Sequence, residues 1–274
     1  MKRVERTLGS RIGDYWLNPF AIVVVIFLLA PVFVVIPMSF SDSNYLEFPP
    51  RVWSLRWYHA YFDSREWMAA TRTSLLAAFS TVLLATPIGF FAAYAIRNMA
   101  GRAGGILFGL LLLPQVAPVI LLAIGVFFLY IRLHLVNSLI GIVLAHTALA
   151  VPFVVTTVSA GLKRFDFRLD QAARSLGASR LRAIRDVMLP QIRLSLIAGA
   201  IFAFVTSLDE VVVSLFIAGG DNTVLTRKMF LALRDQVDPT IAAISTLLII
   251  VSVVVVGVFM IVSQRNVRRH NDNA

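Results

Sequence analysis

Asp209 and Glu210 are adjacent carboxylates inside an otherwise apolar stretch, residues 194–217. A carboxylate surrounded by hydrocarbon is costly, so such residues normally face the interior of a helix bundle and mark a route for ions or substrates. A cationic solute would be their natural counterion, whereas the alternative interpretation is a structural pair that is neutralised by an arginine or lies near the outer membrane interface. Adjacent residues of a helix diverge by about 100°. We therefore expect only one of the two to face a pathway, with Asp209 as the first choice.

Other groupings that could carry chemistry are missing from the sequence. There is no cysteine, which excludes thiolate nucleophiles, disulfides and thiolate metal sites. His59 and His134 have no partner at metal-ligand spacing, so we expect no metal and no cofactor. Gln115 and His146 are lone polar residues in apolar stretches, where hydrogen bonding between helices is the usual role. Without a Gly-x4-Gly-Lys-Ser/Thr run the chain does not bind nucleotide by that route, and we expect no enzyme.

The polar segment 163–193 is patterned rather than random. Gly177 stands where a helix C-terminus favours a left-handed residue, Ser179 is placed to cap a second short helix, and Pro190 enters the next apolar stretch. Apolar residues precede the glycine at helical spacing, namely Leu169, Ala172, Ala173 and Leu176. The pattern predicts a helix, glycine turn, helix hairpin lying on a membrane face. A loop that simply anchors to anionic lipid headgroups is the alternative interpretation.

The composition indicates which elements position these residues. The 274 residues are 58% hydrophobic and 15% charged, with a mean hydropathy of +0.81, which excludes a soluble globule. A hydrocarbon core of about 30 Å is spanned by about 20 helical residues, and the runs are too long and lack the alternation of barrel strands. We therefore predict an all-α polytopic membrane protein with six transmembrane helices, at residues 19–40, 73–96, 106–131, 138–162, 194–217 and 240–262.

Prolines occur within the first four of these stretches, including Pro114 and Pro118 in the third. A proline removes a backbone donor, and in lipid the freed carbonyl must find a partner in a neighbouring element. We therefore expect these helices to be bent and packed in a bundle.

Lysine and arginine set the expected orientation. The formal net charge is +10, and roughly two thirds of the Lys and Arg fall on one side if both termini are inside. The prediction is a cytoplasmic segment 1–18, a transmembrane domain 19–263 that includes the cytoplasmic loop 163–193, and a cytoplasmic tail 264–274. Because membrane orientation accounts for the excess of Lys and Arg, we expect no nucleic-acid partner.

The loop resembles the signature of ATP-binding-cassette importer permeases, Glu-Ala-Ala, three residues, Gly, nine residues, Ile-x-Leu-Pro. The chain carries Gln171 in place of the Glu and Val187 in place of the Ile, and Asp170 supplies an acid one position earlier. The run Ser-Leu-Asp-Glu-Val-Val-Val-Ser-Leu-Phe at 207–216 and the Asp-Pro-Thr at 238–240 further resemble the spermidine/putrescine permease branch.

This resemblance implies that the loop is a coupling hairpin between the fourth and fifth spans, acting on a separate ATPase subunit through Asp170, Gln171, Ala172, Ala173, Gly177, Ala178, Ser179, Leu189 and Pro190. It also implies a bacterial inner-membrane permease that forms half of a pathway for a polyamine or similar organic cation. The implied partners are two ATP-binding subunits, a second, similar permease in a heterodimer, an external substrate-binding protein and membrane lipid. An ion-coupled secondary carrier using Asp209 or Glu210 and a non-transporting scaffold are the alternatives.

Overall fold

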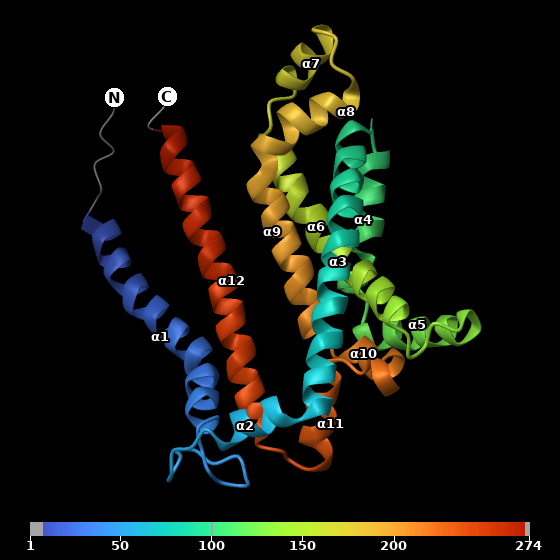
Figure 1. The fold of residues 1–274 in the computed structure, drawn as a ribbon. Helices are drawn as coiled ribbons and strands as arrows, with labels where there is room; N and C mark the ends of the chain where they lie inside the picture. Colours follow the sequence, from blue (N-terminus) through green and yellow to red (C-terminus); the bar gives the residue numbers. More distant parts are fainter. Residues whose placement is uncertain (1–7, 100, 272–274) are drawn as a thin grey trace. The chain divides into compact units, whose positions relative to one another are not determined.

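The computed structural model describes residues 8–99 and 101–271, and these residues are almost entirely helical. Their only β pairing is an isolated bridge between Ser41 and Trp53. The chain divides into two compact units, residues 1–63 with 236–250 and residues 64–235 with 251–274. Each unit is described separately. Figure 1 labels the helices.

The first unit contains α1 (Leu8–Met38), α2 (Arg56–Asp63) and the beginning of α12 (Thr240–Asn271). The side chains at 17–30 in α1 are all exposed. In the loop that follows, Ser39 Oγ lies 2.7 Å from Tyr58 Oη. Asp238 Oδ1 accepts the backbone N–H of Thr240 at 2.9 Å, which caps the start of α12.

Three long helices form the body of the second unit, α3 (Arg65–Asn98), α6 (Leu139–Arg164) and α9 (Leu189–Asp209), and they pack against one another (Figure 1). Small residues make the close approach possible. A Cβ built on Gly89 of α3 would lie 2.6 Å from Val154 of α6, and one on Gly199 of α9 would lie 3.3 Å from the same side chain. Packing of this kind is typical of helices in lipid, where apolar burial alone does not drive association.

The third predicted span is wrong as a single helix. Residues 103–133 form α4 (Ala103–Val116) and α5 (Val119–Leu133), which are bent by 96° at the break between them. Pro118 is the N-cap of α5 and Pro114 lies inside α4, so the predicted bending is confirmed but is far stronger than a kink. Among the described residues, five helices are long and apolar enough to span a membrane, or six if this bent pair is one span.

The fifth predicted span, 194–217, is also wrong as one helix. α9 ends at Asp209, Glu210 has an extended backbone, and α10 (Val212–Ile217) begins after it. At its other end α9 follows the π-helical turn η1 (Ile184–Met188) and α8 (Arg180–Ala183) without a break. A short 3-10 turn, η2 (Gly220–Asn222), and α11 (Leu225–Asp235) complete the region before α12.

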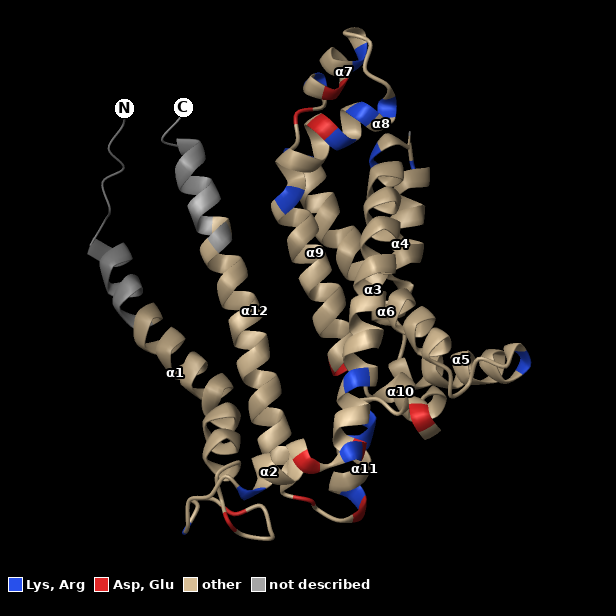
Figure 2. Cartoon of the chain, in the orientation of Figure 1, with Lys and Arg blue, Asp and Glu red and all other residues tan. Residues whose placement is uncertain are grey.

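Charge is confined to the two ends of the α3, α6 and α9 bundle. Figure 2 shows Lys, Arg, Asp and Glu around α7 (Phe167–Ser175) and α8 at one end and around α11 and the start of α3 at the other. The middle of the three helices carries none of these residues. This distribution is what a bilayer core requires of helices that cross it.

Candidate functional site

The segment between α6 and α9 reverses direction at Gly177. The φ of Gly177 is +91°, its N–H bonds the carbonyl of Arg174 at 3.0 Å, and the N–H of Ala178 bonds the carbonyl of Ala173 at 3.1 Å. These two bonds are the Schellman arrangement, which satisfies the free carbonyls at the end of α7. Ser179 Oγ then accepts the N–H of Arg182 at 3.3 Å and caps α8. The expected glycine turn and serine cap are therefore both present.

The helices on either side of the turn expose two leucines, Leu176 with 89% and Leu181 with 72% of the side chain accessible. Of the predicted coupling residues, Gln171, Ala172, Gly177, Ser179 and Pro190 are exposed, Ala173, Ala178 and Leu189 are partly buried, and Asp170 is buried. The exposed face thus combines apolar and polar groups, and the acid offered by the sequence does not lie on it.

Asp170 faces the inside of the hairpin and is only 5% accessible. Its Oδ2 lies 4.0 Å from Nη1 of Arg174, while its Oδ1 has no hydrogen-bond partner among the described residues. A buried carboxylate without a partner is costly, and Arg174 is the partner nearest to this one. Gln171, which is exposed, takes the outward position beside it.

The hairpin is attached to α3 by two reciprocal aromatic contacts. The guanidinium of Arg180 in α8 lies 5.2 Å from the ring of Tyr94 in α3, and its Nε donates to Tyr94 Oη at 3.1 Å. The guanidinium of Arg97 in α3 lies 4.9 Å from the ring of Phe167 in α7. Together with the unbroken α8, η1 and α9 run, these contacts join the hairpin to two helices of the bundle.

The two carboxylates of the apolar stretch lie at the break after α9, which changes their interpretation. Glu210 Oε1 accepts the N–H of Val213 at 2.7 Å, and its backbone carbonyl accepts Thr226 Oγ1 of α11 at 3.0 Å. Glu210 is therefore partly buried and bonded to the start of α10. The side chain of Asp209 is exposed and makes no hydrogen bond or ion pair with any described residue. The expected divergence of about 100° between the two side chains assumes one continuous helix, and this assumption fails because α9 ends at Asp209.

A buried polar network lies in the same region. His146 Nδ1 is 2.8 Å from Ser207 Oγ, His146 Nε2 is 3.1 Å from Ser214 Oγ, and Ser207 Oγ donates to Thr81 Oγ1 at 3.4 Å. The network connects α6 to α9, α10 and α3, so the expected interhelical role of His146 is confirmed. Gln115 is exposed and has no hydrogen bond within the described chain, so the same expectation is not met there.

Sequence reasoning missed Thr81, Ser207 and Ser214 as partners of the histidine, and the only signal was small hydroxyls within apolar stretches. Over the described ranges, no group of three or more His, Asp and Glu residues is placed to hold a metal ion.

Long apolar helices with a helix-turn-helix segment before the penultimate one define a polytopic helical membrane protein. Residues 85–272 match the family described as binding-protein-dependent transport system inner membrane component, and the chain belongs to this family. It is therefore a multi-pass inner-membrane permease of an ATP-binding-cassette importer and not an enzyme, because ATP hydrolysis belongs to a separate subunit. This membership replaces the carrier and scaffold interpretations.

Two curated relatives are permeases named for polyamine transport. The chain is 28% identical over 250 residues to the spermidine/putrescine transport system permease protein PotC of Haemophilus influenzae, covering 91% of this chain and 96% of the relative. It is 29% identical over 243 residues to the putrescine transport system permease protein PotI of Escherichia coli, covering 85% and 86%. A solved bacterial alginate transporter, bound to a periplasmic protein carrying alginate pentasaccharide, has a similar fold, with a TM-score of 0.70, 16% identity and coverage of 95% and 98%.

Proposed function

We propose that this permease forms half of the translocation pathway for a polyamine or similar organic cation, and that the α7–α8 hairpin couples it to a separate cytosolic ATPase. The observation that carries the coupling proposal is the Gly177 turn with two exposed leucines beside it. Burying a leucine side chain is worth about 1.5–3 kcal/mol, so Leu176 and Leu181 favour an apolar groove on a partner. Arginines around them, among them Arg174 and Arg182, favour an acidic rim on that groove.

Force on the hairpin would reach the membrane by two routes. The helical run from Arg180 to Asp209 carries motion of α8 directly into α9, and the Arg180–Tyr94 contact carries it into α3. Packed helices respond to such motion as rigid bodies. Closure of two ATPases around ATP would then move α3 and α9 together.

The proposed orientation places the hairpin and both chain termini in the cytoplasm of a bacterial cell. The excess of Lys and Arg in the loops on that side supports it. The opposite end of the α3, α6 and α9 bundle, with α11 and the start of α3, would then receive an external substrate-binding protein.

A polyamine is the proposed substrate class for two reasons. The curated relatives are named for spermidine and putrescine, and Asp209 is an exposed carboxylate without a cationic partner among the described residues at the break after α9. A carboxylate at a helix break attracts a cation without the need to break an existing ion pair.

A second permease completes the proposed assembly. One chain offers one coupling hairpin, while ATP closure involves two ATPases. The exposed apolar side chains at 17–30 of α1 support a large contact with lipid or another membrane subunit. A heterodimer with a similar permease is the arrangement that the polyamine branch favours.

The test is ATP-dependent uptake in proteoliposomes that contain this permease, its partner permease, the ATPase and the binding protein. Labelled putrescine and spermidine should accumulate with ATP, and a neutral sugar should not. A Leu176→Ala, Leu181→Ala double variant should lose most of the uptake and the co-purifying ATPase. The matched control is Leu133→Ala, a leucine of α5 that is 54% exposed. Equal loss in both variants, or uptake of the sugar alone, would overturn the proposal.

A further inference from the structure

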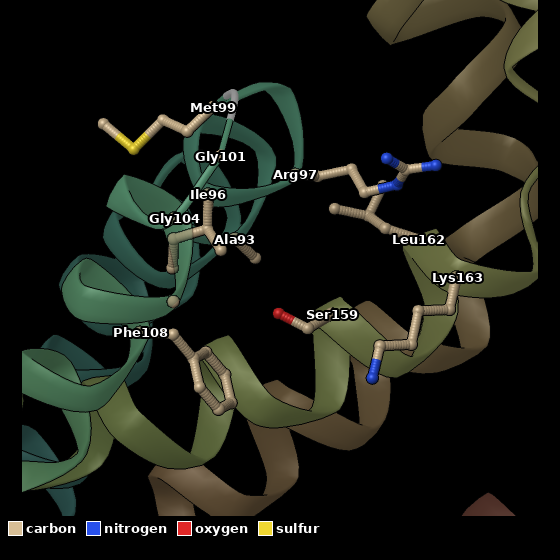
Figure 3. A pocket seen from close by; sticks show the side chains of 11 residues that line it. Ala93, Ile96, Arg97, Met99, Gly101, Gly104, Phe108, Ser159, Leu162 and Lys163 are labelled. Atoms are coloured by element: carbon tan, nitrogen blue, oxygen red, sulfur yellow. The ribbon is translucent and has the colours of Figure 1, made fainter.

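A cavity of about 370 Å³ opens between α3, α4 and α6, at the end of the bundle that carries the hairpin (Figure 3). Its walls include the apolar side chains of Ile96, Phe108 and Leu162, together with three glycines, one just before α4 and two in the first turn of α4. This volume suits a small ligand or the headgroup region of a lipid. No part of the proposed coupling mechanism uses this cavity.

The charged side chains that line the cavity are both cationic. Arg97 of α3 and Lys163 of α6 are among its lining residues, no acidic residue lines it, and neither cation has an ion pair within the described ranges. The hydroxyl of Ser159 points into the space between the helices (Figure 3). Its Oγ is buried and has no hydrogen-bond partner in the described part of the chain. Buried polar atoms normally have a hydrogen-bond partner, so an unpaired one points to a bound molecule that would supply it.

Arg97 can bind a ligand without leaving its present contact. Its guanidinium carbon lies 4.9 Å from the centre of the Phe167 ring, and an arginine has five N–H donors, which leaves donors for a ligand beside this contact. A phosphate held by Arg97 would therefore also stabilise the base of α7. Lys163 stands in the last turn of α6, directly before the same hairpin.

We propose that this cavity binds an anionic phospholipid. The phosphate would lie among Arg97, Lys163 and Ser159, and the acyl chains would follow the apolar wall at Phe108. Two observations favour a lipid over a soluble anion. The cavity has an apolar wall next to its cations, and it lies where the charge-free middle of α3 and α6 gives way to their basic ends. The leaflet is the cytoplasmic one if the proposed orientation holds, but the site does not depend on it.

Lipid retention on the full chain tests the site. The purified permease in detergent is incubated with equal amounts of dioleoyl-phosphatidylglycerol and dioleoyl-phosphatidylcholine, and bound lipids are counted by native mass spectrometry. We expect the native chain to favour phosphatidylglycerol several-fold and an Arg97→Gln, Lys163→Gln variant to lose that preference. The control Arg164→Gln, Arg168→Gln removes the same charge from neighbouring exposed positions outside the cavity and should behave as the native chain.

A variant that fills the cavity distinguishes lipid binding inside it from general attraction of anionic lipid to basic side chains. Gly105 lines the cavity, and a Cβ built on it meets no atom within 4 Å, so Gly105→Leu would fill the space while keeping every charge. Gly109, one turn further along α4, is equally unobstructed but does not line it, so Gly109→Leu is the matched control. We expect only Gly105→Leu to reduce phosphatidylglycerol retention.

Three results would overturn the proposal. These are equal retention of the two lipids by the native chain, unchanged preference in both the charge and the Gly105→Leu variants, and displacement of phosphatidylglycerol by millimolar inorganic phosphate alone. The last would assign the site to a free anion. Circular dichroism and gel filtration show whether each variant is folded, and none of these measurements depends on transport.

Discussion

At the residue scale, Asp209 and Glu210 are neighbours with different tasks. Glu210 uses its carboxylate to accept the N–H of Val213 at the start of α10, whereas Asp209 is exposed and unpaired in the described structure. The sequence identified the pair because carboxylates in apolar stretches are rare. The choice of Asp209 over Glu210 assumed one continuous helix, and the different contacts of the two residues depend on a helix break that hydropathy does not detect.

Asp209→Asn should therefore lower uptake of a polyamine. Attraction between unit charges about 4 Å apart is about 4 kcal/mol at an effective dielectric of 20, before desolvation. A net loss of one or two kcal/mol would reduce transport about tenfold. Initial uptake rates in proteoliposomes measure this, with binding-protein affinity and basal ATPase as unchanged references.

The conservative control for Asp209 is Glu210→Gln, because an amide oxygen can still accept the N–H of Val213. We expect it to keep most of the uptake. Parental transport by the Asp209→Asn variant would place that carboxylate outside the pathway, and the cationic substrate would then rest on the relatives alone.

Gly177 gives a second prediction at this scale. A β-branched side chain at φ +91° costs more than about 1 kcal/mol, so Gly177→Val should distort the turn between α7 and α8. ATPase stimulation and uptake should fall together while membrane insertion persists. Gly125→Val tests a glycine of α5 with open space around it and ordinary φ, and it should retain coupling. Normal uptake by an assembled Gly177→Val complex would contradict the coupling role.

The turn at Gly177 and the cap at Ser179 could be predicted because both follow from local backbone chemistry. The partners of His146 could not, since Ser207 and Ser214 lie 61 and 68 residues away and meet it only through packing.

At the element scale, the positions of the long helices could be predicted from the sequence, whereas the breaks within two of the predicted spans could not. Hydropathy predicted α3 and α6 well because each is a continuous apolar run. The same method joined α4 to α5 and α9 to α10, because it measures length and apolarity and not direction. Pro118 explains the first break, and Glu210, whose side chain bonds the backbone of the next helix, accompanies the second.

The contact between α8 and α3 gives a prediction at this scale. Arg180→Ala removes both the stacking on Tyr94 and the hydrogen bond to its hydroxyl, so binding-protein-stimulated ATPase and uptake should fall several-fold. Tyr94→Phe keeps the ring and loses only the bond, so its effect should be smaller. Arg132→Ala is the matched control, because this arginine of α5 is exposed and lies outside the hairpin.

A double-mutant cycle with Arg180→Ala and Tyr94→Phe tests whether the two residues act together. Additive losses would mean that the hydrogen bond between Arg180 and Tyr94 carries no coupling between α8 and α3.

At the scale of the whole molecule, the placement of Lys and Arg in the sequence predicts which side of the membrane each loop faces. The helix packing in the structure does not decide this orientation. The fold class followed from composition, since so apolar a chain has no soluble alternative. The orientation is still a prediction. It places the leucines beside Gly177 in the cytoplasm and the exposed Asp221 on the outer side.

The absence of cysteine from the sequence makes this orientation directly measurable, because any introduced thiol is unique. A Leu176→Cys variant should react with a membrane-impermeant maleimide in inverted vesicles but not in intact cells, and Asp221→Cys should show the reverse. Both positions are exposed, so a lack of labelling reports the side of the membrane and not burial. Adding the ATPase to inverted vesicles should protect Leu176→Cys, because that side chain would enter the groove. Labelling of Leu176→Cys in intact cells would reverse the topology and remove the ATPase from that face.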